Sequence, residues 1–270
     1  MSEPQHVETG SEKVLCRIEE GVAVVTLNDP ENRNPLGYDT RPVLRATIDR
    51  IARDDEVRCL LLTGAGDAFC AGGNAKAMAT DEQPPLETRI RQIRFESEVV
   101  ALIQEMAKPS IAALPGPAAG AGFSLALSCD LRIASESAFL LTAFGRLGLP
   151  GDFGGTWLLT QLVGPARARE LYFTSRRVPA EECERLGLVN RVVPADALQR
   201  EAMGLARQLA AGPPVAFRWM KDNLNRALHS DLRTCLREEA ERQCWAAETE
   251  DFREATQAFV EKREPEFRGR

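Results

Sequence analysis

The sequence predicts an α/β core followed by a helical lobe, and three observations support this fold class. Apolar runs of strand length alternate with helix-length segments as far as Val193. Residues 196–260 then show only helical spacing and are rich in arginine and glutamate. Strand–helix–strand order implies parallel pairing with right-handed crossovers. We therefore expect an α/β domain over residues 1–195 and a helical lobe over residues 196–270.

The first elements follow from apolar patterning and turn residues. Val22–Leu27 has the composition of a strand and ends at the turn Asn28-Asp29-Pro30. A helix follows, because apolar residues recur on one of its faces, namely Leu44, Ile48 and Ile51. The run of Cys and Leu in Val57–Thr63 predicts a buried strand, which closes on Gly64-Ala65-Gly66.

The remaining elements repeat this order. Residues 74–88 are polar and contain proline, so we expect a mobile loop there, and Arg89–Ala107 has a helical pattern. We then predict a strand over Ser110–Leu114, a helix over Gly122–Ser128 and a strand over Leu131–Ala134. One further strand is predicted over Val189–Val193.

Composition and charge exclude several classes of protein. With 44% hydrophobic and 27% charged residues the chain has an ordinary globular composition. The net charge of −6 argues against a general nucleic-acid surface. No apolar run approaches the ~20 residues of a membrane span. The polar N-terminus lacks the apolar segment of a signal peptide, so we expect a cytoplasmic protein without membrane partners.

Cysteines and histidines do not suggest a metal site. No two of the seven cysteines form a Cys-x-x-Cys pair, and several lie in apolar runs, which favours buried free thiols. His6 and His229 lie far apart in dissimilar contexts. We therefore expect neither a zinc site nor a histidine-based triad.

Residues 60–74 and residues 111–125 share one design: an apolar strand, a glycine-rich turn and the start of a helix. Small residues let a ligand touch the backbone, and helix N-termini present unpaired N–H groups. Two such turns side by side would aim two N–H donors at one oxygen, which defines an oxyanion hole. Ordinary tight turns are the alternative. A dinucleotide fingerprint would need glycine where Phe69 stands, and no P-loop motif occurs.

The motifs of these turns resemble the paired signature of the crotonase (enoyl-CoA hydratase/isomerase) superfamily. The resemblance rests on residues 69–74, residues 116–122 and Cys129-Asp130, with further similarity over residues 28–36, 148–156 and 258–263. It covers nearly the whole chain in the family's order. It implies a crotonase-like spiral of ββα units with a C-terminal helical lobe that assembles the chain into a homotrimer or a dimer of trimers.

The resemblance also implies a site for an acyl-coenzyme A thioester. The N–H groups of Gly73 and Ala121 would form the oxyanion hole, although many relatives have glycine in place of Ala121. The residues implied in substrate or CoA contacts are Arg33, Ala71, Gly72, Gly73, Asn74, Gly120, Ala121, Phe144 and Lys262. No metal, flavin or nicotinamide is implied, because coenzyme A enters as part of the substrate.

Carboxylates separate the possible reactions. Hydratases of this family use glutamates at the positions of Ser124 and Phe144, and water addition needs such an acid–base pair. Asp152 lies among apolar residues and glycines, so burial should raise its pKa and suit it to proton transfer. Alternatively, Asp152 caps the helix that begins near Gly154-Gly155-Thr156.

Residues 143–159 resemble the ring-epoxide isomerase branch of the superfamily, which shifts double bonds in CoA-linked, ring-derived intermediates. An aspartate at position 152 also resembles the nucleophile of 4-chlorobenzoyl-CoA dehalogenase, but Arg89–Val100 lacks the histidine of that enzyme. We therefore predict an acyl-CoA isomerase with Asp152 as the proton shuttle. The alternatives are a hydratase, another crotonase-type reaction, such as hydrolysis or dehalogenation, and a non-catalytic acyl-CoA-binding subunit.

Overall fold

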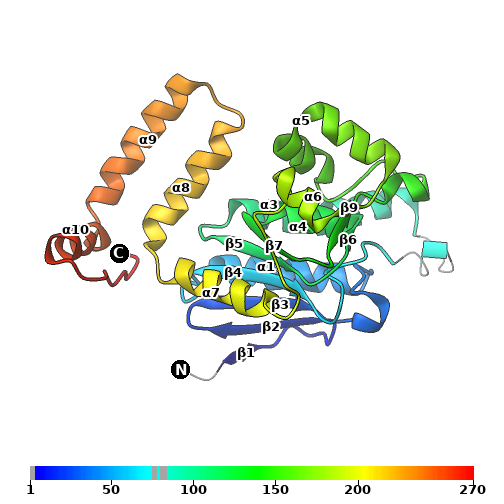
Figure 1. The fold of residues 1–270 in the computed structure, drawn as a ribbon, viewed down its shortest axis with the longest axis horizontal. Helices are drawn as coiled ribbons and strands as arrows, with labels where there is room; N and C mark the ends of the chain where they lie inside the picture. The colour runs from blue at the N-terminus through cyan, green and yellow to red at the C-terminus, as the bar shows by residue number, and fades with distance from the viewer. Residues whose placement is uncertain (1–3, 75–77, 80–83) are drawn as a thin grey trace.

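The computed structural model describes residues 4–74, 78–79 and 84–270, and Figure 1 shows their arrangement. Within these residues the larger sheet has seven strands in the order β1-β2-β3-β4-β5-β7-β10. Its first three strands pair antiparallel, and from β3 onward all neighbours are parallel. A smaller sheet has the order β6-β8-β9. The predicted α/β class with parallel pairing is confirmed.

The larger sheet consists of β1 (Gln5–Val7), β2 (Val14–Glu19), β3 (Val22–Leu27), β4 (Cys59–Gly64), β5 (Ser110–Leu114), β7 (Leu131–Ser135) and β10 (Arg191–Val193). The smaller sheet consists of β6 (Ala118–Ala119), β8 (Phe139–Leu141) and β9 (Val178–Pro179). The helices are α1 (Thr40–Arg53), α3 (Leu86–Glu105), α4 (Ala121–Ser128), α5 (Gly155–Thr174), α6 (Ala180–Arg185), α7 (Leu198–Ala210), α8 (Pro214–Ala227), α9 (Leu232–Ala247) and α10 (Glu250–Glu261), with 3₁₀ turns at Pro30–Asn32 and Phe144–Leu147.

The central strands are buried on both faces, which explains their continuous apolar sequence. In β4, Leu60 and Leu62 pack into the core that also holds the apolar faces of α1 and α3. Leu61 points to the opposite face and packs with α7. Four residues line that face of α7 at a spacing of four, namely Leu198, Ala202, Ala206 and Ala210. The three alanines have small side chains, which let the helix lie close to the sheet.

Most predicted elements are present, with shifted ends. The strand Ser110–Leu114 is found as predicted, and α3 starts at Leu86, before the predicted Arg89. The loop predicted over residues 74–88 therefore contains the start of α3, and much of it lies outside the described residues. The strand β2 was not predicted, because the apolar Leu15 is exposed between the buried Val14 and Cys16, so burial alternates along the strand but polarity does not.

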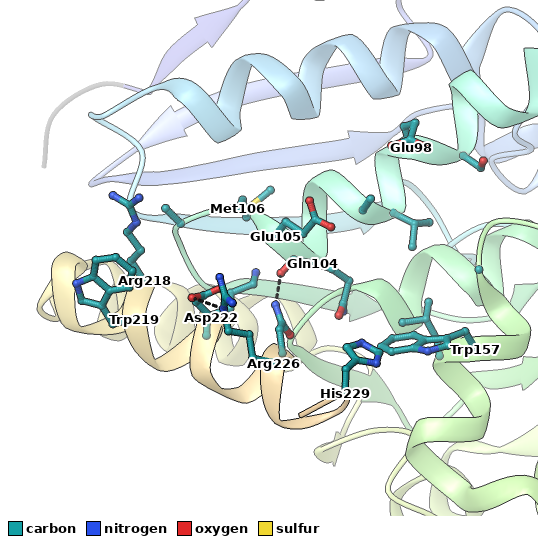
Figure 2. A pocket seen from close by; sticks show the side chains of 18 residues that line it. Glu98, Gln104, Glu105, Met106, Trp157, Arg218, Trp219, Asp222, Arg226 and His229 are labelled. Carbon is teal, nitrogen blue, oxygen red and sulfur yellow. Dashed lines mark hydrogen bonds and ion pairs between the residues drawn. The ribbon is translucent and has the colours of Figure 1, made fainter. Parts of the chain in front are cut away.

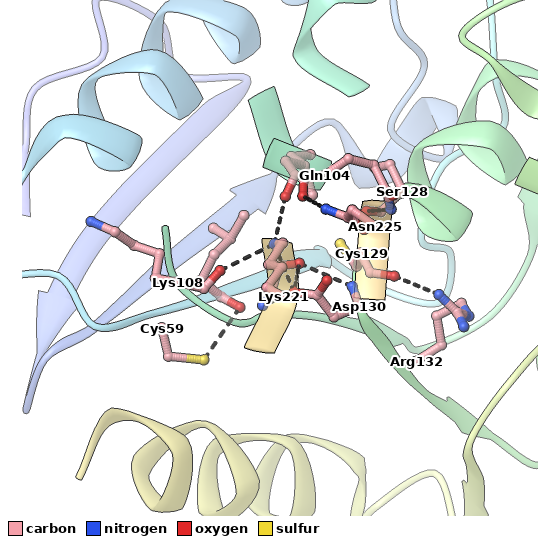
Figure 3. Close-up of polar contacts among 12 residues, drawn as sticks. Cys59, Gln104, Lys108, Ser128, Cys129, Asp130, Arg132, Lys221 and Asn225 are labelled. Carbon is pink, nitrogen blue, oxygen red and sulfur yellow. Dashed lines mark hydrogen bonds and ion pairs between the residues drawn. The ribbon is translucent and has the colours of Figure 1, made fainter. Parts of the chain in front are cut away.

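A buried polar cluster, which we call the α8 joint, fastens α8 to the core (Figure 3). The Lys221 ammonium donates to the Ile103 and Lys108 carbonyls at 2.8 and 3.1 Å and to the Asp130 carboxylate at 2.8 Å. The same carboxylate oxygen accepts from the N–H and the hydroxyl of Ser110, both at 2.8 Å. Asp130 thus connects a core strand to the first helix of the C-terminal arm.

The helical region after residue 195 contains one helix that packs on the larger sheet and three that do not. α7 follows residue 195, yet it covers one face of the larger sheet. The helices α8, α9 and α10 extend away from the sheets as an arm (Figure 1). Large apolar side chains lie exposed on this arm, including Leu224, Leu232, Trp245 and Phe259. The division between residues 195 and 196, and the role of the arm in assembly, stay predictions.

Candidate active site

The two glycine-rich turns lie against each other. The N–H of Ala119 donates to the Cys70 carbonyl at 2.9 Å, and Cys70 forms an isolated parallel β-bridge with Ala118. Gly72 has φ 89°, and a Cβ there would lie 2.6 Å from the Ala119 oxygen and 3.3 Å from the Ala121 nitrogen. Only glycine fits so close a backbone contact. The first turn therefore brings Gly72 and Gly73 to the start of α4.

The hydrogen-bond pattern singles out two donors at this contact. The N–H of Gly72 lies 3.4 Å from the Cys70 sulfur, and the N–H of Gly120 donates to Leu141 at 3.0 Å. The N–H groups of Gly73 and Ala121, by contrast, have no acceptor among the residues that the structure describes. Ala121 opens α4, so its N–H also carries the positive end of the helix dipole. This arrangement suits an oxygen that gains negative charge.

The opening loop packs beside the first turn. The N–H of Leu36 donates to the Gly72 carbonyl at 2.7 Å, and the N–H of Ala71 donates to the Arg33 carbonyl at 2.9 Å. The fully buried amide of Asn34 holds this loop, because it donates to the Ala65 and Ala68 carbonyls at 2.9 and 2.8 Å. Arg33, Ala71 and Gly72 are thus neighbours, as their predicted roles require.

Lys262 does not join this group within one chain. It ends α10, which Figure 1 places at the opposite end of the molecule from α5 and β6. Asn74 follows Gly73 at the site, and its carbonyl accepts from the N–H of Met78 at 3.0 Å. No observation in the chain assigns either residue a role.

Asp152 brings a carboxyl group to the turn that precedes α5. Its Oδ1 is shielded from solvent and has no hydrogen-bond partner among the described residues. Burial raises the pKa of this carboxyl from 3.8 to about 6, although the charge of Arg41 lowers it. The N-cap of α5 is Gly154, and the Asp152 side chain makes no capping bond. The capping alternative is therefore wrong, and the group is available for proton transfer.

Ser124 and Phe144, the positions where the resemblance implies glutamates in hydratases, lie close to Asp152 and to Tyr172, respectively. The fully buried Ser124 hydroxyl donates to the Asp152 carbonyl at 3.0 Å. The buried Phe144 ring stacks on Tyr172, with centroids 5.9 Å apart and planes at 10°. Neither Ser124 nor Phe144 offers a carboxyl group, whereas Asp152 beside Ser124 does.

Three further residues near Asp152 have no signal in the sequence. Arg41 and Glu96 form an ion pair of 3.0 Å with both side chains less than a tenth exposed. Burial raises the pKa of Glu96, and the charge of Arg41 opposes this. Tyr172 has a buried hydroxyl without a partner in the described chain. All three lie on helices, α1, α3 and α5, and only the folded chain brings them together.

Strained backbone residues directly adjoin Phe144 and Asp152. Ala143, just before Phe144, has φ 58°, and Phe153, just after Asp152, has φ 49°. Non-glycine residues in this left-handed region cost on the order of 1–3 kcal/mol each, and such costs concentrate at functional sites. The strain supports a functional role for the segments that carry Phe144 and Asp152.

A cavity of about 930 Å³ borders the site between α3, α8 and the start of α5 (Figure 2). Trp157 and His229 stack at one end of it with ring centroids 5.5 Å apart. Gly154 belongs to its wall, whereas Gly73, Ala121 and Asp152 do not. Gly73, Ala121 and Asp152 thus lie outside this cavity, and Gly154 connects its wall to the turn of Asp152.

Across residues 4–74, 78–79 and 84–270, no three His, Cys, Asp or Glu side chains are placed to share a metal ion. In the same part of the chain, no helix combines the length and the apolar character that crossing a membrane requires.

Comparisons with known proteins agree with this geometry. Residues 17–270 match the sequence profile of the family described as enoyl-CoA hydratase/isomerase. The "1,2-epoxyphenylacetyl-CoA isomerase" of Escherichia coli K12 is 38% identical over 260 residues, covering 96% of this chain and 99% of that protein. A "probable enoyl-CoA hydratase" of Rhodobacter capsulatus is 42% identical over 257 residues, covering 95% and 98%. The solved enoyl-CoA hydratase of Bacillus anthracis superposes with a TM-score of 0.90 at 32% identity, covering 96% and 100%.

Proposed function

Because the chain belongs to the enoyl-CoA hydratase/isomerase (crotonase) superfamily and has its fold, we propose that it is an acyl-CoA isomerase that moves a C=C bond through a thioester enolate. The family acts on acyl-CoA thioesters. One observation carries the choice of reaction: the shielded Oδ1 of Asp152 has no hydrogen-bond partner among the described residues, and Asp152 lies beside Ser124. Ser124 and Phe144 hold the two positions where the family resemblance implies glutamates in hydratases.

In the proposed reaction the N–H groups of Gly73 and Ala121 bind the thioester oxygen. The Asp152 carboxylate takes a proton from a carbon beside the C=C bond, and the electron pair moves onto the thioester as an enolate. The resulting Asp152 carboxylic acid returns the proton to the far carbon of the conjugated system. Atoms and charge balance, and no separate cofactor takes part. A carboxyl with a pKa of about 6 suits both half-steps near neutral pH.

Hydration is the competing reaction, and the names of the relatives include it. Water addition needs one group to activate water and one to deliver a proton. Ser124 and Phe144 supply neither, and Phe144 is an apolar wall where water would have to be held. The proposal therefore follows the isomerase relative and not the hydratases.

Coenzyme A is proposed to lie along the opening loop, near Arg33, Ala71 and Gly72. Lys262 would contact its phosphates only from a second copy of the chain, because α10 lies far from the site. The exposed apolar side chains of the arm support a trimer or a dimer of trimers. Light scattering that gives only a monomer at micromolar concentration would contradict this assembly.

The reaction is tested by incubating the enzyme with 3-hexenoyl-CoA, 2-hexenoyl-CoA and ring-derived enoyl-CoAs. Isomerisation moves the double bond without a change of mass, whereas hydration adds the mass of one water. We expect at least one substrate to be converted without a change of mass. Absorbance and mass spectrometry measure this conversion. Accumulation of the hydrated product alone would overturn the isomerase proposal, and tight CoA binding without any conversion would leave a binding subunit.

A further inference from the structure

Tyr172 carries a buried hydroxyl that the proposed isomerisation does not use. The hydroxyl is shielded from solvent and has no partner in the described chain. Buried side-chain hydroxyls almost always have a hydrogen-bond partner, so an exception needs an explanation. Asp152 Oδ1 is a second unpaired atom in the same neighbourhood. Two such atoms together indicate that a ligand completes their hydrogen bonds.

The glycines around Asp152 fix the position of this hydroxyl. A Cβ at Gly151 would lie 3.3 Å from the Tyr172 oxygen, and a Cβ at Gly155 would lie 2.8 Å from it and 2.2 Å from the Ser124 hydroxyl. The Tyr172 oxygen thus lies under the turn that carries Asp152, beside α4. Larger residues at Gly151 or Gly155 would fill the space around it.

The Phe144 ring connects Tyr172 to the other end of the site. It stacks on Tyr172, and its Cε1 lies 3.8 Å from where a Cβ of Gly120 would be. Gly120 directly precedes Ala121, whose N–H is unpaired. The two rings therefore form a wall that runs from the proposed thioester site to the turn of Asp152. An acyl group held at Ala121 would extend along this wall.

The hydroxyl is a donor and not a base. Burial, with the nearby charge of Asp152, raises the pKa of the Tyr172 phenol above its ordinary value, so it keeps its proton. A hydrocarbon chain along the wall would leave this donor without a partner, which weakens binding. An oxygen atom in the acyl group would accept from it.

We infer that Tyr172 is a specificity-determining residue, whose hydroxyl donates a hydrogen bond to an oxygen atom carried by the acyl group beyond its thioester. The inference rests on the proposed function for the placement of the acyl group. It assigns the substrate class as acyl-CoAs with an ether, epoxide or carbonyl oxygen near the reacting carbons. Plain hydrocarbon acyl chains of the same length are then poorer ligands.

The test uses thioesters that cannot isomerise, so it does not depend on turnover. Calorimetry measures binding of 3-methoxypropanoyl-, 4-methoxybutanoyl- and 5-methoxypentanoyl-CoA, which place one ether oxygen at successive positions. Pentanoyl-, hexanoyl- and heptanoyl-CoA are their carbon isosteres. The wild type is compared with Tyr172→Phe, which removes one oxygen atom. Thr174→Val is the control, since it removes a hydroxyl from the exposed side of the same helix.

We expect at least one ether to bind the wild type about tenfold more tightly than its isostere, as one net hydrogen bond allows. Tyr172→Phe should abolish this ratio and bind the isosteres at least as well, while Thr174→Val should keep it. Equal ratios in the wild type and Tyr172→Phe would overturn the inference, as would the absence of any ether preference. Failure of the isomerase assay with an intact ether preference would instead reject the proposed reaction and retain Tyr172 as a binding residue.

Discussion

The turn of Asp152 and the α8 joint are two buried polar clusters with opposite degrees of pairing. In the joint, the Lys221 ammonium has two carbonyls and the Asp130 carboxylate as partners. At the turn, Asp152 Oδ1 and the Tyr172 hydroxyl have no partner in the described chain. Burying a polar group costs free energy unless it is hydrogen-bonded. A paired buried cluster can therefore stabilise the fold. An unpaired one costs folding free energy, so we expect it to have a role in binding or catalysis.

The difference teaches how to distinguish two aspartates that both lie in family motifs. Asp130 belongs to the Cys129-Asp130 motif, and its carboxylate is occupied by Ser110 and Lys221. The Asp152 carboxyl is free to exchange a proton. Motif membership thus does not reveal function, and hydrogen-bond pairing in the fold does.

The largest expected effect is on the rate of Asp152→Asn. Asparagine keeps the size of the side chain but cannot accept the proton, and losing a general base typically costs ~10²–10⁴-fold in rate. Binding of a CoA thioester should change little, because the oxyanion donors are backbone groups. Initial rates with the best enoyl-CoA substrate and calorimetry with acetyl-CoA measure the two quantities.

Asp130→Asn is the matched control for this experiment, since it makes the same change at the paired aspartate. We expect it to lower the melting temperature and to leave kcat of the folded enzyme near that of the wild type. Wild-type turnover by Asp152→Asn would reject the mechanism. A loss of kcat in Asp130→Asn as large as in Asp152→Asn would reject the distinction between the clusters.

The next largest effect is on stability, in Lys221→Met. The variant keeps an apolar stem of similar length but leaves Asp130 and two carbonyls without the ammonium. Breaking a buried ion pair by removing one partner typically costs about 3–5 kcal/mol. Urea unfolding should show a loss of this order, with turnover per folded molecule unchanged below the transition. A loss under about 1 kcal/mol would mean that the joint is not a stabilising cluster.

The sequence predicted the local parts of the site but not the groups contributed from a distance. The two glycine turns were predictable, because a strand, small residues and a helix start follow one another in the chain. Tyr172 was not, because nothing in its local sequence distinguishes it from any other half-buried residue of a helix. The Arg41–Glu96 pair joins α1 to α3, and no local pattern signals such a contact. Pairing across the fold, which separates Asp130 from Asp152, likewise has no signature in the sequence.

A smaller effect is expected in the pH dependence of stability at Asp152. Its carboxyl has a pKa of about 6 in the fold against 3.8 for an ordinary aspartate, so the folded state binds the proton more tightly. The fold therefore loses stability as pH rises from about 4 to about 6, by at most about 3 kcal/mol. Asp152→Asn lacks this loss and should be more stable than the wild type at pH 8, with little difference at pH 4.

Urea unfolding of both proteins across this pH range measures the difference. The gap between them should grow between about pH 4 and 6 and stay constant above, since the carboxyl is then ionised in both states. A gap independent of pH would mean that the Asp152 carboxyl is solvated or paired in the fold. The contrast with the α8 joint would then disappear.

The smallest effect is expected far from both clusters, in Thr249→Ala at the start of α10. The Thr249 hydroxyl accepts from the N–H of Phe252 at 3.1 Å and donates to the Ala246 carbonyl at 2.7 Å. Losing such an N-cap typically costs about 1 kcal/mol.

What Thr249→Ala measures is whether the arm unfolds together with the core. If the α8 joint couples them, one transition should shift by the whole cost of the cap, whether followed by the fluorescence of Trp245 in the arm or by far-ultraviolet circular dichroism. If the arm unfolds by itself, only the Trp245 signal should shift. Trp157 and Trp219, the other tryptophans, are replaced by Phe in both proteins so that fluorescence reports on the arm alone.

Adding Lys221→Met should separate two transitions that coincide when the joint is intact, because the ammonium is the link between α8 and Asp130. Coincident transitions with and without Lys221 would show that other contacts hold the arm to the core, and the joint would then be a local cluster.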